Sequence, residues 1–72
     1  MSTKEIKIHE DQEFITLNVL LKITGLISTG GMAKVFLANN VVTINGEKDN
    51  RRGRKLYRND VIRVLNETFV IK

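Results

Sequence analysis

The hydrophobic pattern of this chain changes near its middle, and this change limits the folds open to it. In the first half, apolar side chains such as Leu17 and Leu21 recur at helical spacing. In the second half, a β-branched run at residues 41–44 and apolar stretches at residues 61–65 and 68–71 predict strands. Helices followed by strands are typical of an α+β domain, in which the helices pack on one side of a small sheet.

The first helix is expected over residues 17–24. Thr16 can cap it, because a threonine hydroxyl can accept a hydrogen bond from the free N–H groups of the first turn. Gly25 can end it, since glycine takes the left-handed conformation easily. Val19 and Ile23 are expected to widen its apolar face.

A second helix is expected to be capped by Ser28 or Thr29 and to run to about Ala38. Asn39 and Asn40 would end it, because asparagine tolerates the left-handed conformation better than most residues. The apolar stripe of this helix is expected to consist of Met32, Val35 and Phe36, with Ala33 and Leu37 beside them.

Turn signals divide the second half of the chain. Asn45-Gly46 follows the run at residues 41–44, and Asn-Gly between strands is the strongest short hairpin signal. The residues after it are polar and basic up to Leu56, so we expect a tight turn into a long basic loop rather than a two-stranded hairpin. Further turns are expected at Asn59-Asp60 and Asn66-Glu67, and a short edge strand at residues 5–8.

The positive charge of the chain is concentrated in one segment. The net charge is +4, yet residues 48–63 hold seven basic and two acidic side chains, a local charge of +5. Residues 1–47 carry a charge of −1, with four basic and five acidic groups. A solvated loop that only aids solubility is the simplest alternative, but such clustering favours a site for polyanions.

Composition excludes several classes of protein. A chain of 72 residues forms one domain at most, and its small core leaves little room for a water-excluding active-site cavity. The chain has no cysteine and a single histidine, His9, in an acidic turn. Gly30-Gly31 lacks the glycine-lysine-serine ending of a phosphate-binding loop. We therefore expect no catalytic residue, no metal site and no cofactor.

The expected location of the protein follows from its apolar stretches. The longest are residues 19–21 and 35–38, far shorter than the ~20 residues of a membrane span. Residues 1–10 are of mixed charge and resemble no secretory signal. A cytoplasmic protein that does not insert into membranes, and that acts as a monomer, is the expectation.

Residues 16–65 resemble the S4 RNA-binding domain, also called the alpha-L motif. The matching pieces are Leu17-Asn18-x-x-Leu21, Gly25, Ser28, Ala33-Lys34, Leu37, Val42-x-Ile44-Asn45-Gly46-Glu47 and Asn59-Asp60-x-Ile62-x-Val64. The resemblance implies two short helices packed on a small bent, mostly antiparallel sheet. It also implies a single domain over residues 1–72, like the short stand-alone bacterial members of the family, with a further strand at each end of the motif.

The resemblance implies RNA contacts at the start of the second helix and along the basic segment. A helix start offers unpaired N–H groups and a positive dipole, and glycines there would let a phosphate approach closely. Arginine binds phosphate oxygens with a planar fork of donors. The predicted contact residues are Ser28, Thr29, Gly30, Gly31, Lys34, Asn45, Lys48, Arg51, Arg52, Arg54 and Lys55.

Some of these residues have simpler explanations. The two glycines could merely permit a tight turn between the helices, and a turn-forming role for Asn45 is favoured over a contact with a base. Tyr57 could stack on a base, but a half-buried ring is the favoured interpretation. The family usually has an arginine where this chain has Gly30, and often a basic residue where it has Thr16. We therefore expect the basic segment to carry more of the affinity here.

The predicted function is a non-catalytic RNA-binding module for structured RNA. Proteins recognise the splayed phosphates and the shallow minor groove of folded RNA through shape and charge. The family suggests ribosomal or tRNA-like RNA, the ribosome or a particle in ribosome assembly as the partner. Charge alone does not distinguish RNA from duplex DNA. A protein-interaction module that docks an acidic partner, or pairs through edge strands at residues 5–8 and 68–71, is one alternative, and an accessory subunit of an RNA-modifying enzyme is another.

Overall fold

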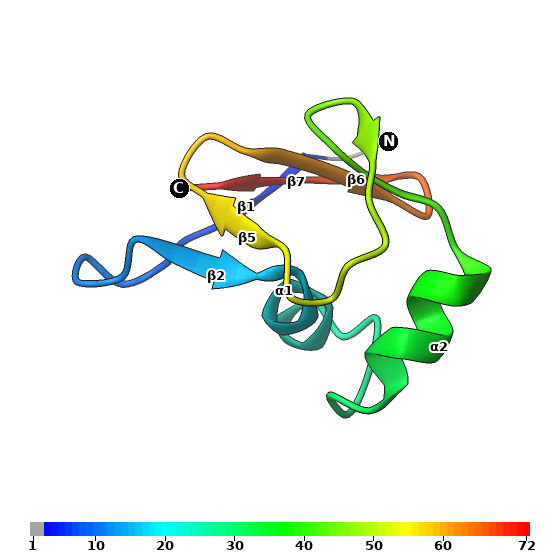
Figure 1. The fold of residues 1–72 in the computed structure, drawn as a ribbon. Coiled ribbons are helices and arrows are strands. Elements are labelled where there is room, and N and C mark those ends of the chain that lie inside the picture. Colours follow the sequence, from blue (N-terminus) through cyan, green and yellow to red (C-terminus); the bar gives the residue numbers. More distant parts are fainter. Residues whose placement is uncertain (1–2) are drawn as a thin grey trace.

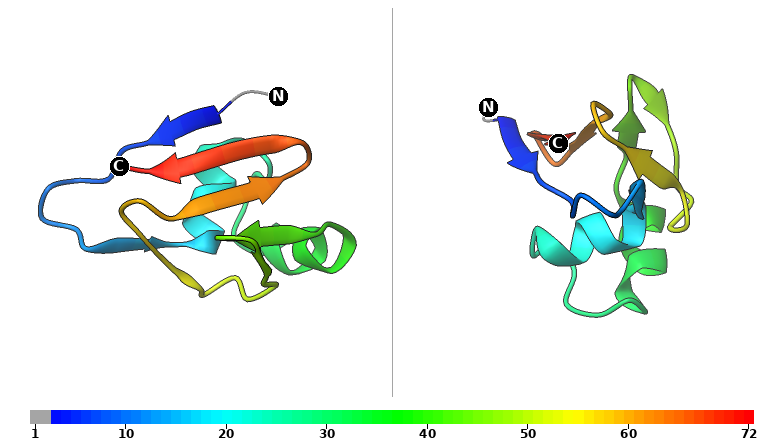
Figure 2. Two further views of the ribbon diagram at one scale, coloured as in Figure 1. Left: turned by 90° about the horizontal axis from the view of Figure 1, so that it is seen from above. Right: turned by 90° about the vertical axis from the view of Figure 1, so that its left-hand side faces the viewer.

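The computed structural model describes residues 3–72, so residues 1 and 2 of the predicted domain lie outside the described residues. Both helices lie below the main sheet in the orientation of Figure 1, and Figure 2 shows the same layering from two further sides. The elements follow in the order β1 (Thr3–Ile6), β2 (Phe14–Thr16), α1 (Leu17–Ile23), α2 (Met32–Asn39), β3 (Val42–Ile44), β4 (Glu47–Lys48), β5 (Lys55–Tyr57), β6 (Val61–Val64) and β7 (Glu67–Ile71).

The main sheet has five strands in the order β1-β7-β6-β3-β4. The β1–β7 pair is parallel, and the three other pairs are antiparallel. Strands β2 and β5 form a separate antiparallel ribbon. Two short helices on a small, mostly antiparallel sheet confirm the predicted α+β class.

The core lies between the helices and the main sheet. Leu17, Leu20 and Leu21 of α1 are 0% exposed, and Ile62 of β6 and Phe69 of β7 meet the same cluster from the sheet. Each such side chain contributes roughly 1.5–3 kcal/mol through burial. This packing positions α1 under the sheet and, through α1, the loops that start beside it.

Helix α1 begins and ends close to the prediction. The Thr16 hydroxyl accepts a hydrogen bond from the N–H of Val19 at 3.4 Å, which confirms Thr16 as the cap. The helix ends at Ile23, and Gly25 takes a φ of 81° just after it. The prediction of a wide apolar face was wrong, because Val19 and Ile23 are 39% and 58% exposed and only the three leucines face the core.

Helix α2 differs from the prediction at its start. Its N-cap is Gly31, with no side-chain cap, so neither Ser28 nor Thr29 caps it. The predicted stripe is also rotated, since Met32 and Val35 are 45% and 63% exposed. The buried residues are Ala33 and Leu37, with Phe36 partly buried against the core. The helix therefore faces the core with Ala33, Leu37 and part of Phe36, and its other side is exposed.

The end of α2 was predicted with the wrong backbone geometry. Asn40 has a φ of −135° and a ψ of 141°, so it is extended rather than left-handed. The two asparagines act through their side chains instead. Asn39 Nδ2 donates to the Val35 carbonyl at 2.8 Å, and Asn40 Nδ2 donates to the Phe36 carbonyl at 2.9 Å. These bonds hold the two asparagine side chains against the last turn of the helix.

The Asn45-Gly46 turn makes a short hairpin, where the sequence pattern predicted a loop instead. Asn45 and Gly46 have φ values of 53° and 87°, the two positive angles that a tight hairpin turn requires. Strand β4 then pairs with β3 over two residues, with Thr43 opposite Lys48. The long basic loop does follow, at residues 49–54, and these six residues are called the basic loop below.

The β2–β5 ribbon was not predicted. Ile15 and Leu56 lie opposite each other in it, and both are buried in the core. The Phe14 and Tyr57 rings pack at a centroid distance of 5.8 Å. Each strand has three residues, too few for an alternating pattern, and about 40 residues separate the partners. Tyr57 is 47% exposed, so it is more exposed than the half-buried ring that the sequence predicted.

The outer strands required two corrections. The first strand lies at Thr3–Ile6 rather than residues 5–8, and it pairs with β7. Strand β7 is therefore an inner strand between β1 and β6, and β1 alone of this pair lies at an edge. The last turn falls on Leu65 and Asn66, both with positive φ, one residue earlier than predicted.

Candidate nucleic-acid interface

The basic loop is attached through its backbone to the start of α1. The Arg54 carbonyl accepts from the N–H of Leu17 at 2.9 Å, and the Arg52 carbonyl accepts from the N–H of Asn18 at 2.9 Å. Earlier in the loop, the N–H of Asp49 donates to the Val42 carbonyl at 3.0 Å. The loop thus occupies the first N–H groups of α1. At the start of α2, the N–H groups of Met32 and Ala33 donate to the carbonyls of Thr29 and Gly30 at 3.1 and 3.2 Å.

Asp49 joins two arginines of the basic loop. Its Oδ1 accepts from the backbone N–H of Arg51 at 2.9 Å and from Arg51 Nε at 3.1 Å. Its Oδ2 accepts from Arg51 Nη2 at 2.8 Å and from Arg54 Nη1 at 3.0 Å. The Asp49 side chain is 9% exposed and that of Arg51 is 69% exposed. The carboxylate thus lies under the two guanidinium groups.

These contacts keep Asp49 ionised. The hydrogen bonds from Arg51, followed by the bond from Arg54, hold the pKa of Asp49 well below the ordinary range of a carboxyl, against the opposing effect of burial. The same contact raises the pKa of Arg51. The carboxylate therefore compensates much of the positive charge that Arg51 and Arg54 bring to the loop.

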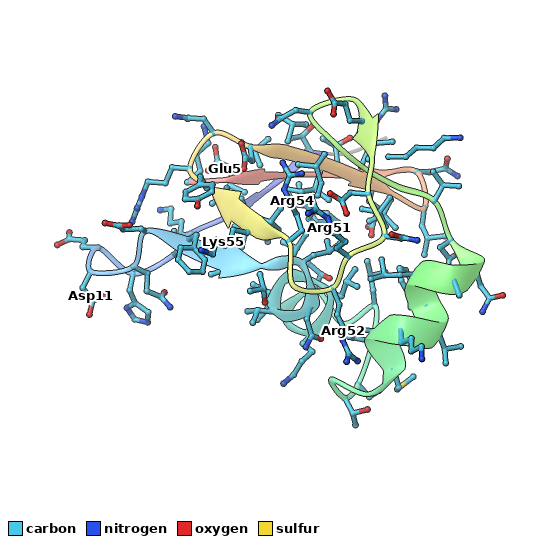
Figure 3. The ribbon with its side chains drawn as sticks, viewed as in Figure 1. Glu5, Asp11, Arg51, Arg52, Arg54 and Lys55 are labelled. Carbon is cyan, nitrogen blue, oxygen red and sulfur yellow. The ribbon has the colours of Figure 1, made fainter. Side chains whose placement is uncertain are left out.

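Two further cations of the basic segment also have partners within the protein. Arg58, which directly follows β5, donates to the carbonyls of Gln12 and His9, both at 2.9 Å, and so links the end of β5 to the turn before β2. Lys55 Nζ lies 4.9 Å from the centre of the Phe14 ring, a cation–π contact. In Figure 3, Lys55 lies along the β2–β5 ribbon, while Arg52 points toward α2.

Lys34, Lys48 and Arg52 make no side-chain hydrogen bond or ion pair with any residue in the range 3–72. Lys34 on α2 and Arg52 on the basic loop line the same groove of about 400 Å³, together with Asn50. A second groove of about 720 Å³ adjoins it and includes Lys48 and Asp49. The fold therefore brings together Lys34 and Arg52, which lie 18 positions apart in the sequence.

The turn before α2 leaves space around its two glycines. A Cβ on Gly30 would lie 3.4 Å from Asn18 Nδ2, an ordinary contact, and one on Gly31 would lie 4.0 Å from the Thr29 hydroxyl. Neither glycine has a positive φ. The turn itself would thus accept other residues, which weakens the explanation that the glycines merely permit a tight turn.

The side-chain amide of Asn45 makes hydrogen bonds within the protein at both its nitrogen and its oxygen. Its Nδ2 donates to Asp60 at 3.1 Å, and its Oδ1 accepts from the N–H of Val61 at 3.0 Å. These bonds join the β3–β4 turn to the turn before β6, in agreement with its expected turn-forming role. Asn45 therefore lies in a structural junction rather than in the groove between α2 and the basic loop.

Sequence reasoning missed Asp49, because it was counted only as an acidic charge in a basic segment. The signal was present in its spacing. An aspartate side chain in a loop often accepts from the backbone N–H two residues later, as Asp49 does from Arg51. Asn50, which lines both grooves, was also missed, and nothing in the local pattern distinguishes it from a solvated loop residue.

Two other features, a metal site and a membrane-spanning helix, are absent from the described residues. Within residues 3–72, no three histidine, aspartate or glutamate side chains gather where they could hold a metal ion. Neither helix in this range has the length and apolar character needed to cross a membrane.

A cationic groove between a helix and a loop, on a small α+β domain, is typical of a nucleic-acid-binding domain. The sequence model of the S4 domain family matches residues 6–72, so the chain belongs to the S4 domain family. It is also similar to a protein of Bacillus subtilis (strain 168) named Probable ribosome maturation protein RlbA. The two are 54% identical over 54 residues, which cover 75% of this chain and 76% of that relative.

Proposed function

We propose that this protein is a non-catalytic module that binds structured RNA through the groove between α2 and the basic loop. The target is ribosomal RNA or a ribosome-assembly intermediate. In this proposal Lys34 and Arg52 bind phosphates across the groove, and Lys48 extends the contact. The turn before α2, with the hydroxyls of Ser28 and Thr29 and the backbone N–H groups of Gly30 and Gly31, binds a further phosphate.

The observation that carries this proposal is the pairing state of the cations. Lys34 and Arg52 line one groove and have no partner in residues 3–72, so binding a phosphate breaks no existing ion pair. Each phosphate that they neutralise releases counterions, which favours binding at low salt. About three contacts, from Lys34, Lys48 and Arg52, give a slope of log affinity against log salt near −3.

The class of RNA follows from what the surface offers. Phe14 and Tyr57 pack against each other, and Lys55 covers the Phe14 ring, so these rings are poorly placed to stack on unpaired bases. Recognition by charge and shape suits folded RNA. The name of the Bacillus subtilis relative, which refers to ribosome maturation, supports ribosomal RNA as the target.

The test compares two pairs of substitutions with equal loss of charge. Lys34→Gln with Arg52→Gln removes two cations from the groove. Lys4→Gln with Lys7→Gln removes two cations on and beside β1, at the opposite sheet edge from β4. Binding to ribosomal RNA fragments and co-sedimentation with ribosomal particles are the measurements.

We expect the groove variant to lose at least tenfold in affinity and the β1 variant to stay within about threefold of wild type, since a charge-assisted contact is worth about 1.5–3 kcal/mol. Equal losses in the two variants would contradict the groove assignment. Partners that remain in a native pull-down after nuclease treatment would favour a protein-interaction role instead, through the edge strand β1.

A further inference from the structure

We propose that Asp49 determines the specificity of this surface: it is a built-in anion that occupies the phosphate-binding groups of Arg51 and Arg54 until a suitably shaped RNA displaces it. The proposal rests on the function proposed above, because it concerns the same surface. It assigns opposite roles to neighbouring arginines, since Arg52 is available to any polyanion and Arg51 is not.

The geometry of Asp49 is that of a bound phosphate. Arg51 Nε and Nη2 reach the two carboxylate oxygens at 3.1 and 2.8 Å, which is the paired arrangement by which arginine binds phosphate. Arg54 Nη1 adds a third guanidinium contact at 3.0 Å. A phosphate that uses the same edge of Arg51 must therefore replace the carboxylate.

Asp49 is held firmly in this position. Its N–H donates to the Val42 carbonyl at 3.0 Å, and its side chain is only 9% exposed. Arg51 is 69% exposed and Arg54 is 33% exposed, so these side chains can swing outward while Asp49 stays in place. Displacement then means that one or both arginines turn from the carboxylate to the RNA.

The competition between Asp49 and a ligand phosphate changes the affinity for some polyanions more than for others. A polyanion that meets only the basic loop benefits little from Arg51 and Arg54, because each bond that it forms with these arginines replaces a bond to Asp49. An RNA that also reaches Lys34 and Arg52 is held close to the loop, where its next phosphate competes with Asp49 at high local concentration. Asp49 thus lowers the affinity for polyanions that contact only the basic loop more than the affinity for an RNA that also reaches Lys34 and Arg52. A repulsive group creates specificity through such a difference in affinity.

The backbone of the basic loop has supports other than Asp49. The carbonyls of Arg52 and Arg54 accept from the first N–H groups of α1 at 2.9 Å. Asparagine at position 49 can keep the bond to the N–H of Arg51 without a negative charge. We therefore expect Asp49→Asn to fold normally, and Asp49→Ser, whose hydroxyl can accept the same bond, serves as a second variant.

The experiment compares Asp49→Asn with Asp11→Asn, which also removes one negative charge but at a different place on the surface. Asp11 makes no side-chain hydrogen bond or ion pair with residues 3–72 and lies at the tip of the turn before β2, away from Arg51 and Arg54 in Figure 3. The probes are a heparin column and a poly(A)·poly(U) duplex, and circular dichroism verifies the fold of each variant.

We expect Asp49→Asn and Asp49→Ser to elute from heparin at clearly higher salt than Asp11→Asn. Their affinity for the duplex should also fall more steeply with salt, by about threefold more between 50 and 200 mM for each additional phosphate contact. If the Asp49 variants and Asp11→Asn behave alike on both probes, the proposal is overturned. If wild type fails to bind ribosomal RNA, the proposed function fails, while the heparin comparison still decides the role of Asp49.

Discussion

Arg51 and Arg52 are adjacent and chemically identical, yet the structure predicts that they contribute unequally to RNA binding. We consider the substitutions Arg51→Gln and Arg52→Gln, each of which removes one positive charge. Arg51 makes two guanidinium bonds to Asp49, at 3.1 and 2.8 Å. Arg52 makes no side-chain bond with residues 3–72 and lines the groove with Lys34.

The magnitudes follow from these contacts. Binding a phosphate costs Arg52 no existing partner, so its loss removes a charge-assisted contact worth about 1.5–3 kcal/mol, or roughly tenfold or more in affinity. Arg51 has to give up Asp49, so its net contribution is the small difference between two similar ion pairs. We expect Arg51→Gln to weaken binding by less than about threefold, within the 0–1 kcal/mol of an exposed ion pair.

Fluorescence anisotropy with a labelled ribosomal RNA fragment, repeated over a series of salt concentrations, measures both effects. Arg52→Gln should make the slope of log affinity against log salt about 0.9 less negative, and Arg51→Gln should leave it nearly unchanged. Equal losses for the two variants, or a larger loss for Arg51→Gln, would refute the argument that Asp49 sets the availability of these arginines.

Three further predictions concern stability, measured by thermal unfolding. Gly46 has a φ of 87°, so Gly46→Ala should cost about 1–2 kcal/mol and lower the melting temperature by several degrees, and an unchanged value would show that the turn relaxes. Leu56 is 0% exposed, so Leu56→Ala should cost about 2–5 kcal/mol, while a loss below 1 kcal/mol would mean that the β2–β5 ribbon is not part of the cooperative core. Because the pKa of Asp49 is lowered in the folded state, its stabilising effect is present above about pH 4 and is lost as the pH falls further, so Asp49→Asn should depend less on pH in the acid range than wild type. Parallel acid profiles for the two proteins would argue against the Asp49 network in solution.

Local signals predicted the elements that local interactions stabilise. The Thr16 cap and Gly25 stop of α1 depend on groups within one helical turn, and the positive φ angles of Asn45 and Gly46 belong to those residues themselves. The order of helices and strands, and hence the α+β class, followed from such signals. The start of α2 was predicted wrongly: the helix begins after Gly31 without a side-chain cap, and Ala33 in its first turn is buried in the core.

The β2–β5 ribbon shows why the other elements could not be predicted. Phe14–Thr16 is a strand because Lys55–Tyr57 lies beside it, and each is buried through a single residue. Strand β7 likewise becomes an inner strand only because β1 arrives from the other end of the chain. A strand of three residues is too short to show an alternating pattern, and no local pattern specifies which distant strand it will pair with.

The sequence by itself determined the family, the order of the elements and the concentration of positive charge in residues 48–63. Only the tertiary structure decided which of those charges are available. In the folded protein, Arg51 and Arg54 bind Asp49, and Arg58 donates to the carbonyls of His9 and Gln12. Arg52 lines a groove with Lys34 instead. The physical reason is that composition specifies the amount of charge, whereas the field that a ligand meets depends on the distance from each charge to its nearest partner.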